Sequence, residues 1–186
     1  METARGRVYW ITGLSGAGKS TLAASLASIL RGRGRSAILL DGDQLREILD
    51  ARTGHGREER FALAMRYAKL CKLLSEQGLD VVIATISMFR DVHAWNRQSL
   101  PDYVEIYLRV PLDELRRRDP KGIYRAADAG EKRDVAGMDL AVEPPEAPDL
   151  LIEHRPGDTA ESVLADVLSR LGISSFPRPQ GGKGYD

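Results

Sequence analysis

The stretch Gly13-Leu14-Ser15-Gly16-Ala17-Gly18-Lys19-Ser20 is the most informative part of this sequence. It fits the phosphate-loop pattern G-x-x-x-x-G-K-[ST] at every fixed position. A run of β-branched and aromatic residues, Val8–Thr12, precedes it and predicts a buried strand. Apolar residues at helical spacing follow it and predict a helix over Lys19–Leu30. Because the full pattern lies between a strand and a helix, it predicts a P-loop nucleotide-binding domain and not a chance glycine-rich turn.

The residue types of this loop suit a bound triphosphate. Its glycines allow the backbone to wrap closely around phosphate oxygens, and successive N–H groups and the helix N-terminus supply a positive field. We expect Lys19 to reach the β- and γ-phosphates of ATP, and the Ser20 hydroxyl to ligate Mg²⁺. The predicted ATP-binding residues of the loop are Gly13, Ser15, Gly16, Ala17, Gly18, Lys19, Ser20 and Thr21.

Strands and helices alternate along the rest of the chain. Such alternation predicts a three-layer α/β domain, in which a five-stranded parallel sheet is covered by helices on both faces. We expect this single domain to span residues 1–173, with an irregular charged segment over residues 119–148 and a flexible tail over residues 174–186. The further predicted strands cover 36–40, 80–85, 103–110 and 150–153, and the further predicted helices cover 46–50, 58–77 and 162–171.

The composition limits the partners that we expect for the domain. Among 186 residues, 27 Lys and Arg balance 27 Asp and Glu, so no broad basic surface for nucleic acid or membranes is predicted. Cys71 is the single cysteine, which excludes a disulfide within the chain and favours a cytoplasmic location. We identify no signal-peptide pattern and no apolar run of the roughly 20 residues needed to span a bilayer. The histidines share no metal-ligand spacing, so no zinc site is predicted.

The acidic residues favour a kinase over other P-loop proteins. No N-K-x-D motif for reading guanine is present, and the apolar strand that ends at Ala84 leads into Thr85-Ile86-Ser87 without the acid typical of a motor ATPase. Acids instead end the second strand, as Asp41-Gly42-Asp43, at the sheet edge where the P-loop lies. Phosphoryl transfer to a hydroxyl needs a carboxylate that accepts the hydroxyl proton. We assign that role to Asp43 and the orientation of Mg²⁺-bound water to Asp41; the alternative is that this segment is only a turn.

Further motifs resemble those of adenylylsulfate (APS) kinases, which phosphorylate the ribose 3′-hydroxyl of adenosine 5′-phosphosulfate. The resemblance covers roughly residues 8–153. After the P-loop, its most specific motif is the run Arg118-Asp119-Pro120-Lys121-Gly122-Ile123-Tyr124. The other matching segments are Leu40-Asp41-Gly42-Asp43 with Arg46, Ala68-Lys69-Leu70, Ile86-Ser87, Gly137-Met138-Asp139 and Glu143-Pro144-Pro145.

The resemblance implies an ATP- and Mg²⁺-dependent enzyme of sulfate assimilation that forms a homodimer and closes a lid over its active site. Residues 119–148 lie where that lid would be, and lid closure would exclude water. Arg46, Arg57 and Lys121 match family positions that contact the acceptor, and their charges suit an anion. The predicted acceptor-binding residues are Asp41, Asp43, Arg46, Arg57, Arg60, Ile86, Ser87, Lys121 and Val135.

The predicted catalytic residues are Asp43, Lys19 and Ser87, and the predicted metal-binding residues are Ser20 and Asp41. In APS kinases, the serine that matches Ser87 is often regarded as a phosphoserine intermediate. In-line transfer between two bound nucleotides needs no covalent relay, so we interpret Ser87 as a hydroxyl that positions the acceptor. Arg118, in the specific R-D-P-K-G-x-Y motif, is expected to contact the adenine or phosphates of ATP.

The sequence departs from the family pattern on the acceptor side. APS kinases hold the acceptor adenine between two aromatic side chains, but here Thr53-Gly54-His55 and Val135 stand at the matching positions. Arg60 replaces the usual asparagine, and Met88 replaces the usual proline. Stacking of a base on an aromatic ring contributes roughly 1–3 kcal/mol. We therefore expect weaker binding of the usual acceptor unless His55 or another group compensates.

We take APS as the leading acceptor, and two alternatives remain open. The segment Ala84–Phe89, which reads A-T-I-S-M-F, is similar to that of related enzymes that phosphorylate cytidine diphosphoramidate. The second alternative is of another class, a non-catalytic nucleotide-binding regulator. Retention of Asp43, Arg46, Arg57 and Lys121 argues against it, because a regulator has no need of acceptor-side groups.

Overall fold

The structure, a computed structural model, describes residues 5–49, 56–100 and 102–173. Five parallel strands form one sheet, which confirms the prediction from the alternation of elements. The strands are β1 (Val8–Thr12), β2 (Ala37–Asp41), β3 (Asp80–Ala84), β4 (Tyr103–Arg109) and β5 (Leu150–Glu153). The helices are α1 (Lys19–Gly32), α2 (Gly42–Ile48), α3 (Arg57–Glu76), α4 (Arg90–Ser99), α5 (Leu112–Arg118), α6 (Ile123–Asp128) and α7 (Ala160–Arg170).

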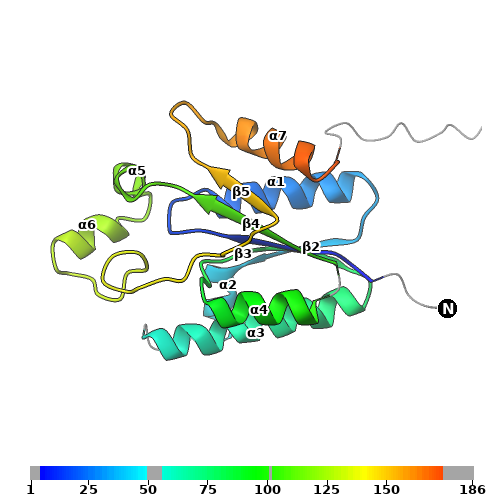
Figure 1. Cartoon of the computed structure of the whole chain (residues 1–186), viewed down its shortest axis with the longest axis horizontal. Coiled ribbons are helices and arrows are strands. Elements are labelled where there is room, and N and C mark those ends of the chain that lie inside the picture. The colour runs from blue at the N-terminus through cyan, green and yellow to red at the C-terminus, as the bar shows by residue number, and fades with distance from the viewer. Residues whose placement is uncertain (1–4, 50–55, 101, 174–186) are drawn as a thin grey trace, which may run out of the picture.

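The strand order is β2-β3-β1-β4-β5, so the strand that leads into the P-loop is at the centre of the sheet. Helices α1 and α7 cover one face, and α2, α3 and α4 cover the other (Figure 1). Helices α5 and α6 project beyond the carboxyl ends of the strands (Figure 1). The predicted three-layer α/β/α architecture is therefore confirmed, and the P-loop lies at the sheet edge where ligands bind in such folds.

Strand β1 is buried on both faces, which explains its unbroken run of apolar and aromatic residues. Tyr9 and Ile11 pack into the core beneath α1 and α7, whereas Val8 and Trp10 pack into the core beneath α3 and α4. Successive side chains of a strand point to opposite faces, and none of these four is more than 3% exposed. The P-loop therefore starts from a rigid strand.

The short helix after β2 begins earlier than the sequence predicts. The expected start is Arg46, but α2 begins at Gly42. Asp41 is its N-cap, and the Asp41 carboxylate accepts a hydrogen bond from the Asp43 amide at 2.9 Å. A capping aspartate satisfies an amide that has no partner within the helix. Asp43 consequently lies in the first turn of a helix and not in an open turn.

Helix α4 has no counterpart among the predicted elements. Few apolar residues occur in Arg90–Ser99, so this segment offers only a short apolar signal. The helix nevertheless packs against α3 and buries Val92, His93 and Asn96. Tertiary contacts stabilise it, because an isolated helix of this length is marginal in water.

The predicted lid segment, residues 119–148, includes α6 and is anchored to the P-loop. The Asp119 carboxylate accepts hydrogen bonds from the amides of Tyr124 at 3.2 Å and Arg125 at 3.0 Å, at the start of α6. The Tyr124 hydroxyl donates to the Ser15 carbonyl at 2.8 Å, and Tyr124 is 1% exposed. Motion of this segment as a lid stays a prediction.

The predicted tail and one histidine lie in parts of the chain that the structure does not describe. The predicted tail, residues 174–186, and His55 lie outside the described residues. Within the described ranges, no helix combines the length and apolar character that crossing a membrane requires.

Candidate active site

The P-loop joins the end of β1 to the first turn of α1. Gly16 and Gly18 have φ angles of 78° and 95°, a left-handed conformation that glycine adopts without strain. At Gly13, an added Cβ atom would lie 2.7 Å from the Leu108 carbonyl, so only glycine allows the loop to pass this close to β4. The loop therefore brings its backbone around the N-terminus of α1, where free amides and the helix dipole favour a phosphate.

Lys19, the first residue of α1, bends back over the P-loop. Its Nζ atom donates a hydrogen bond to the Leu14 carbonyl at 2.8 Å. Burial lowers the pKa of Lys19 to about 8, although the negative charge of Asp43 opposes this shift. A bound triphosphate would favour the charged amine, because opposite charges nearby stabilise the ionised form. This placement suits the predicted contact of Lys19 with the β- and γ-phosphates.

Ser20 and Asp41 form the candidate magnesium site. The Ser20 hydroxyl donates a hydrogen bond to Asp41 Oδ2 at 2.6 Å, so α1 and β2 bring a hydroxyl and a carboxylate together beside the P-loop. Oxygen ligands of this kind fit Mg²⁺, which usually takes one or two protein ligands and completes its shell with phosphates and water. Across the described part of the chain, no group of three or more His, Cys, Asp or Glu residues could hold a metal ion by itself.

A cavity of about 520 Å³ lies beside the P-loop and extends to α2, α3 and the lid segment; we call it the acceptor-side cavity. Residues predicted to bind ATP and residues predicted to bind the acceptor both line it, as transfer between two bound molecules requires. The predicted residues that line it are Ser15, Gly16, Gly18, Lys19, Ser20, Thr21, Asp41, Asp43, Arg46, Arg60, Ile86, Ser87, Lys121 and Val135.

Asp43 and Lys121 form an ion pair in the acceptor-side cavity. Asp43 comes from the first turn of α2, and Lys121 comes from the lid segment. The Asp43 side chain is 72% exposed, so solvent and ligands can reach it. A carboxylate within reach of a bound hydroxyl can accept its proton. The arrangement also brings the lid's cation to the same atoms, so that an acceptor anion and Asp43 would share Lys121.

Ser87 is held in an unusual backbone conformation next to this cavity. Its φ angle is 29°, and its Oγ atom lies 2.7 Å from the Thr85 hydroxyl, within hydrogen-bond distance. Because a carbonyl oxygen can only accept, His93 Nε2 donates to the Ser87 carbonyl, at 3.2 Å. Thr12 Oγ1 donates to the Ile86 carbonyl at 2.5 Å. These contacts orient a hydroxyl, which suits the positioning role that we predict for Ser87.

Arg60 and Val135 meet at the far side of the acceptor-side cavity. Arg60 Nη2 donates to the Asp134 carbonyl at 2.6 Å. Asp139 shapes the same loop, since its carboxylate accepts from the amides of Asp134 at 2.8 Å and Val135 at 2.6 Å. Val135 is 4% exposed and packs into the core. An aliphatic side chain therefore occupies the place at which an aromatic face is expected in the family.

Arg57 is the predicted acceptor-binding residue that lies outside the lining of this cavity. Its guanidinium pairs with Glu143 at 2.5 Å and lies over the Phe89 ring, 5.3 Å from the ring centre. The amide of Arg90 also donates to Glu143, at 2.8 Å. Together, the Arg90 amide and Arg57 hold the pKa of Glu143 below its usual range. Arg57 thus joins α3 to the lid segment, and a direct contact with the acceptor stays a prediction.

Several residues that line the acceptor-side cavity were not predicted as site residues. Tyr67 donates a hydrogen bond from its hydroxyl to the Gly42 carbonyl at 2.9 Å, and burial raises its pKa to about 12, so it stays protonated. Lys132 adds a further cation from the lid segment. Thr85 and Phe89, from the loop after β3, also line the cavity. A helical face shared with Leu63 could have indicated Tyr67, whereas nothing local in the sequence singles out Lys132.

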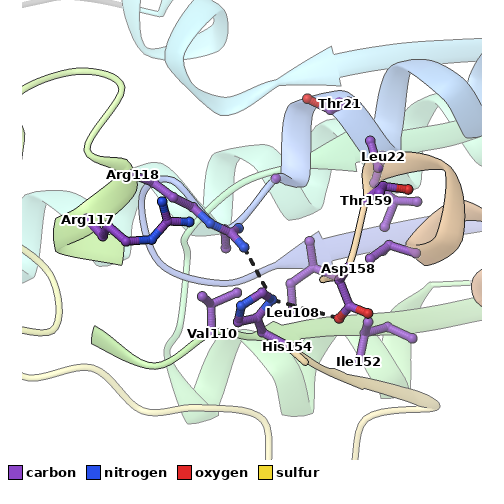
Figure 2. A pocket seen from close by; sticks show the side chains of 14 residues that line it. Thr21, Leu22, Leu108, Val110, Arg117, Arg118, Ile152, His154, Asp158 and Thr159 are labelled. Carbon is purple, nitrogen blue, oxygen red and sulfur yellow. Dashed lines mark hydrogen bonds and ion pairs between the residues drawn. The ribbon is translucent and has the colours of Figure 1, made fainter. Parts of the chain in front are cut away.

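A second cavity of about 310 Å³ lies on the other side of the P-loop; we call it the donor-base cavity (Figure 2). It shares Gly18 and Thr21 with the acceptor-side cavity, and Ala17 also lines it. Arg118, which we predict to contact ATP, lines it together with His154. A nucleotide whose phosphates lie in the P-loop could therefore place its base here. The apolar wall consists of Leu22, Leu108, Val110, Ile152 and Val163.

Comparisons with known proteins show that this chain is similar to nucleotide-phosphorylating enzymes. The profile of the family described as adenylylsulphate kinase matches residues 5–153. A cytidine diphosphoramidate kinase of Campylobacter jejuni is 37% identical over 89% of this chain and 96% of that protein. An adenylyl-sulfate kinase of Clostridium kluyveri is 38% identical over 89% of this chain and 83% of that protein.

A solved structure shows the same fold at similar identity. It is the APS kinase CysC of Mycobacterium tuberculosis in complex with AMPPNP and APS. The two chains superpose with a TM-score of 0.82 at 34% identity, over 90% of this chain and 98% of that one. The likeness therefore extends across most of this chain.

Proposed function

Because the chain belongs to the adenylylsulphate kinase family, we propose that it transfers the γ-phosphoryl group of ATP to the ribose 3′-hydroxyl of a small anionic nucleotide. Enzymes of this family are ATP- and Mg²⁺-dependent kinases that phosphorylate a hydroxyl, and this excludes the non-catalytic regulator. The observation that carries the finer proposal is that Asp43 lines the same cavity as Lys19 and Ser20. A base and a phosphate site share one space in which an acceptor fits.

Each residue of the P-loop side has a defined part in the proposed reaction. The acceptor oxygen attacks the γ-phosphorus, the bond to the β–γ bridging oxygen breaks, and ADP leaves. Asp43 accepts the hydroxyl proton, and Lys19 stabilises the negative charge on the transferred group. Ser20 and Asp41 would hold Mg²⁺, which supplies charge neutralisation at the phosphates when bound. Ser87 orients the acceptor and forms no covalent intermediate.

APS is the leading acceptor in this proposal, and its phosphorylation would place the enzyme in sulfate assimilation. Relatives named as adenylyl-sulfate kinases and the APS-bound structural neighbour support this choice. The charges of the acceptor-side cavity support an anion of this kind, because Arg46, Lys121 and Lys132 all line it. A phosphosulfate group carries the negative charge that these cations would bind.

A cytidine diphosphoramidate is the second candidate acceptor, and a specific observation favours it. Val135 is buried at the position where the family stacks an adenine, and Arg60 lies beside it. A smaller stacking surface costs less affinity for a pyrimidine than for a purine, and an additional guanidinium suits a diphosphate. The Campylobacter relative carries the name of this activity.

A coupled ADP-release assay over a small panel of nucleotides tests the proposal. The panel contains APS, cytidine diphosphate-linked acceptors, and the 3′-deoxy form of each. Turnover of APS with kcat/KM of about 10⁴ M⁻¹s⁻¹ or more would support the leading acceptor. Weak turnover of APS with strong turnover of a cytidine compound would establish the second candidate instead. Equal turnover of a 3′-deoxy control would overturn the proposed nucleophile for both.

Two features that the resemblance implies belong to the same proposal. A homodimer would have twice the chain mass of 20.5 kDa, which light scattering after size-exclusion chromatography measures directly. A lid formed by residues 119–148 would protect its backbone amides from hydrogen exchange when both substrates are bound. A monomeric mass, or identical exchange with and without substrates, would contradict the corresponding feature.

A further inference from the structure

His154 lies in the donor-base cavity, immediately after the last strand, and no role has been assigned to it. Its side chain is 14% exposed, and its amide continues the sheet by donating to the Arg109 carbonyl at 2.9 Å. Figure 2 shows the imidazole between Arg118 on one side and Asp158 on the other. The residue is therefore held in place and points into the cavity.

The contact between His154 and Arg118 defines the tautomer of the imidazole. Arg118 Nη2 lies 3.2 Å from His154 Nδ1. A guanidinium has only donors, so this nitrogen must carry a lone pair. The ring proton is then on Nε2, which lies 3.7 Å from Glu114 Oε1. A neutral His154 with this tautomer is the form that the observed contact requires.

Arg118 is held at both of its ends. Its Nε atom donates to Glu114 Oε1 at 2.7 Å, and its Nη2 atom donates to His154. With Glu114 alone, the planar guanidinium could still swing as a unit about the hydrogen bond from Nε. The second contact removes that freedom and keeps the planar group in the lining of a cavity with an apolar wall. Planar guanidinium groups stack on aromatic rings.

We propose that His154 is a positioning residue of the donor site: its neutral imidazole holds the Arg118 guanidinium against the nucleotide base. The inference rests on the proposed function, because it takes the donor-base cavity as the site of the ATP base. Arg118 is the residue that contacts the base, and His154 acts only through it. Loss of the contact would weaken binding of ATP without affecting a ligand that has phosphates but no base.

Charged side chains surround the imidazole. Asp158 Oδ2 lies 3.8 Å from His154 Nδ1. The charged groups around the ring are Glu114, Arg117 and Arg118 from α5 and Asp158 from the loop before α7; β4, β5 and α1 contribute none to the cavity. Hydrogen bonds from Arg117 and Arg118 lower the pKa of Glu114 to about 2, so that this carboxylate stays charged near neutral pH.

Three proteins and two ligands test the proposal by calorimetry. The proteins are the wild type, His154→Asn and His154→Gln, each checked for folding by circular dichroism. The asparagine amide can place an acceptor where Nδ1 lies, whereas the longer glutamine amide reaches toward Nε2. The ligands are ATP and inorganic tripolyphosphate, both with Mg²⁺, at pH 8.

At pH 8 we expect His154→Gln to bind ATP about 3- to 10-fold more weakly than the wild type, the effect of one hydrogen bond, while His154→Asn binds it normally. Tripolyphosphate should bind equally to all three. Equal ATP affinity of the three proteins would overturn the inference.

Arg118→Ala tests whether His154 acts through Arg118. This variant should bind ATP more weakly than the wild type, and adding His154→Gln to it should cause no further loss of ATP affinity. A further loss in the double variant would overturn the inference, because His154 would then act without Arg118. Failure of the proposed function looks different: the wild type itself would not bind ATP or would transfer phosphate to no acceptor of the panel.

Discussion

At the scale of single residues, the candidate site contains a buried lysine and an ion pair. Lys19 is held against the Leu14 carbonyl, and burial lowers its pKa to about 8. Asp43 is exposed and pairs with Lys121 of the lid segment. We expect both arrangements to change when substrates bind, because phosphates would favour the charged lysine and an acceptor anion would compete for Lys121.

Asp43→Asn should lower kcat by about 10²- to 10⁴-fold, the usual contribution of a positioned base, while the affinity for ATP changes little. The amide keeps the shape of the carboxylate but cannot accept the hydroxyl proton. Steady-state kinetics and ATP calorimetry on the same preparation separate the two effects. If only the KM for ATP rises, Asp43 serves the metal or the phosphates instead.

Binding of ATP to the free enzyme should weaken above pH 8, by up to about tenfold per pH unit. The sign follows from the pKa of Lys19, which is about 8: above this value the free lysine is neutral, and ATP must restore its proton on binding. Calorimetry from pH 7 to 9.5 measures the slope. Lys19→Arg, which stays charged throughout this range, should remove it. An affinity that is constant over the range would show that Lys19 is already charged in the free enzyme.

At the scale of elements, the lid segment and the P-loop contact each other directly. Gly137 has a φ angle of 84°, and a Cβ atom there would lie 2.7 Å from Leu14 Cδ1. Tyr124 binds the Ser15 carbonyl from the same segment. Because both P-loop residues flank the glycines that surround a phosphate, the position of the lid segment is coupled to the shape of the phosphate site.

Gly137→Ala should raise the KM for ATP and lower the free energy of unfolding by about 2–4 kcal/mol, the sum of backbone strain and the contact with Leu14. Gly130→Ala is a matched control, since Gly130 has a φ angle of 74° and nothing lies within 4 Å of its added Cβ. It should lose only about 1–2 kcal/mol and keep its KM. Urea unfolding and kinetics provide both measurements; identical behaviour of the two variants would mean that Leu14 moves aside.

At the scale of the whole molecule, a buried carboxylate connects α4, β4 and the segment that enters β5. Glu105 has a side chain that is 3% exposed, and it accepts hydrogen bonds from Arg97 at 3.2 Å and Tyr103 at 2.9 Å. Arg97 also pairs with Asp149 at 3.3 Å. A buried charge is stable only while its partners remain. This network joins the end of the lid segment to the central layers of the fold.

Arg97→Ala should lower the free energy of unfolding by about 2–4 kcal/mol, because it leaves Glu105 buried with fewer partners. Arg90→Ala on the same helix is the matched control. The Arg90–Glu146 pair is 70% and 72% exposed on its two sides, so its loss should cost less than about 1 kcal/mol. Urea denaturation at pH 7 compares the two. Equal losses would show that the carboxylate of Glu105 is reached by solvent or stays satisfied by Tyr103.

Local patterns were sufficient for the framework of this protein. The P-loop motif and the apolar runs of the strands predicted the sheet and the place of the phosphate site, because a parallel sheet buries both faces of each strand and leaves a continuous apolar signal. Asp41 and Asp43 were predicted as site residues because they come at the end of a predicted strand, at the sheet edge where the P-loop lies. Where the prediction was wrong, at the start of α2, a side-chain cap at Asp41 outweighed the turn chemistry of Asp and Gly.

The sequence by itself therefore determined the fold class and the reaction class of this protein, and it predicted a donor site. Only the tertiary structure decided which distant residues meet: His154 with Arg118, Arg57 with Glu143, and Arg97 with Glu105. It also stabilised α4, a short helix with few apolar residues. The physical reason is that strands, loops and caps depend on neighbours in the chain, whereas ion pairs between separate elements depend on how the layers pack.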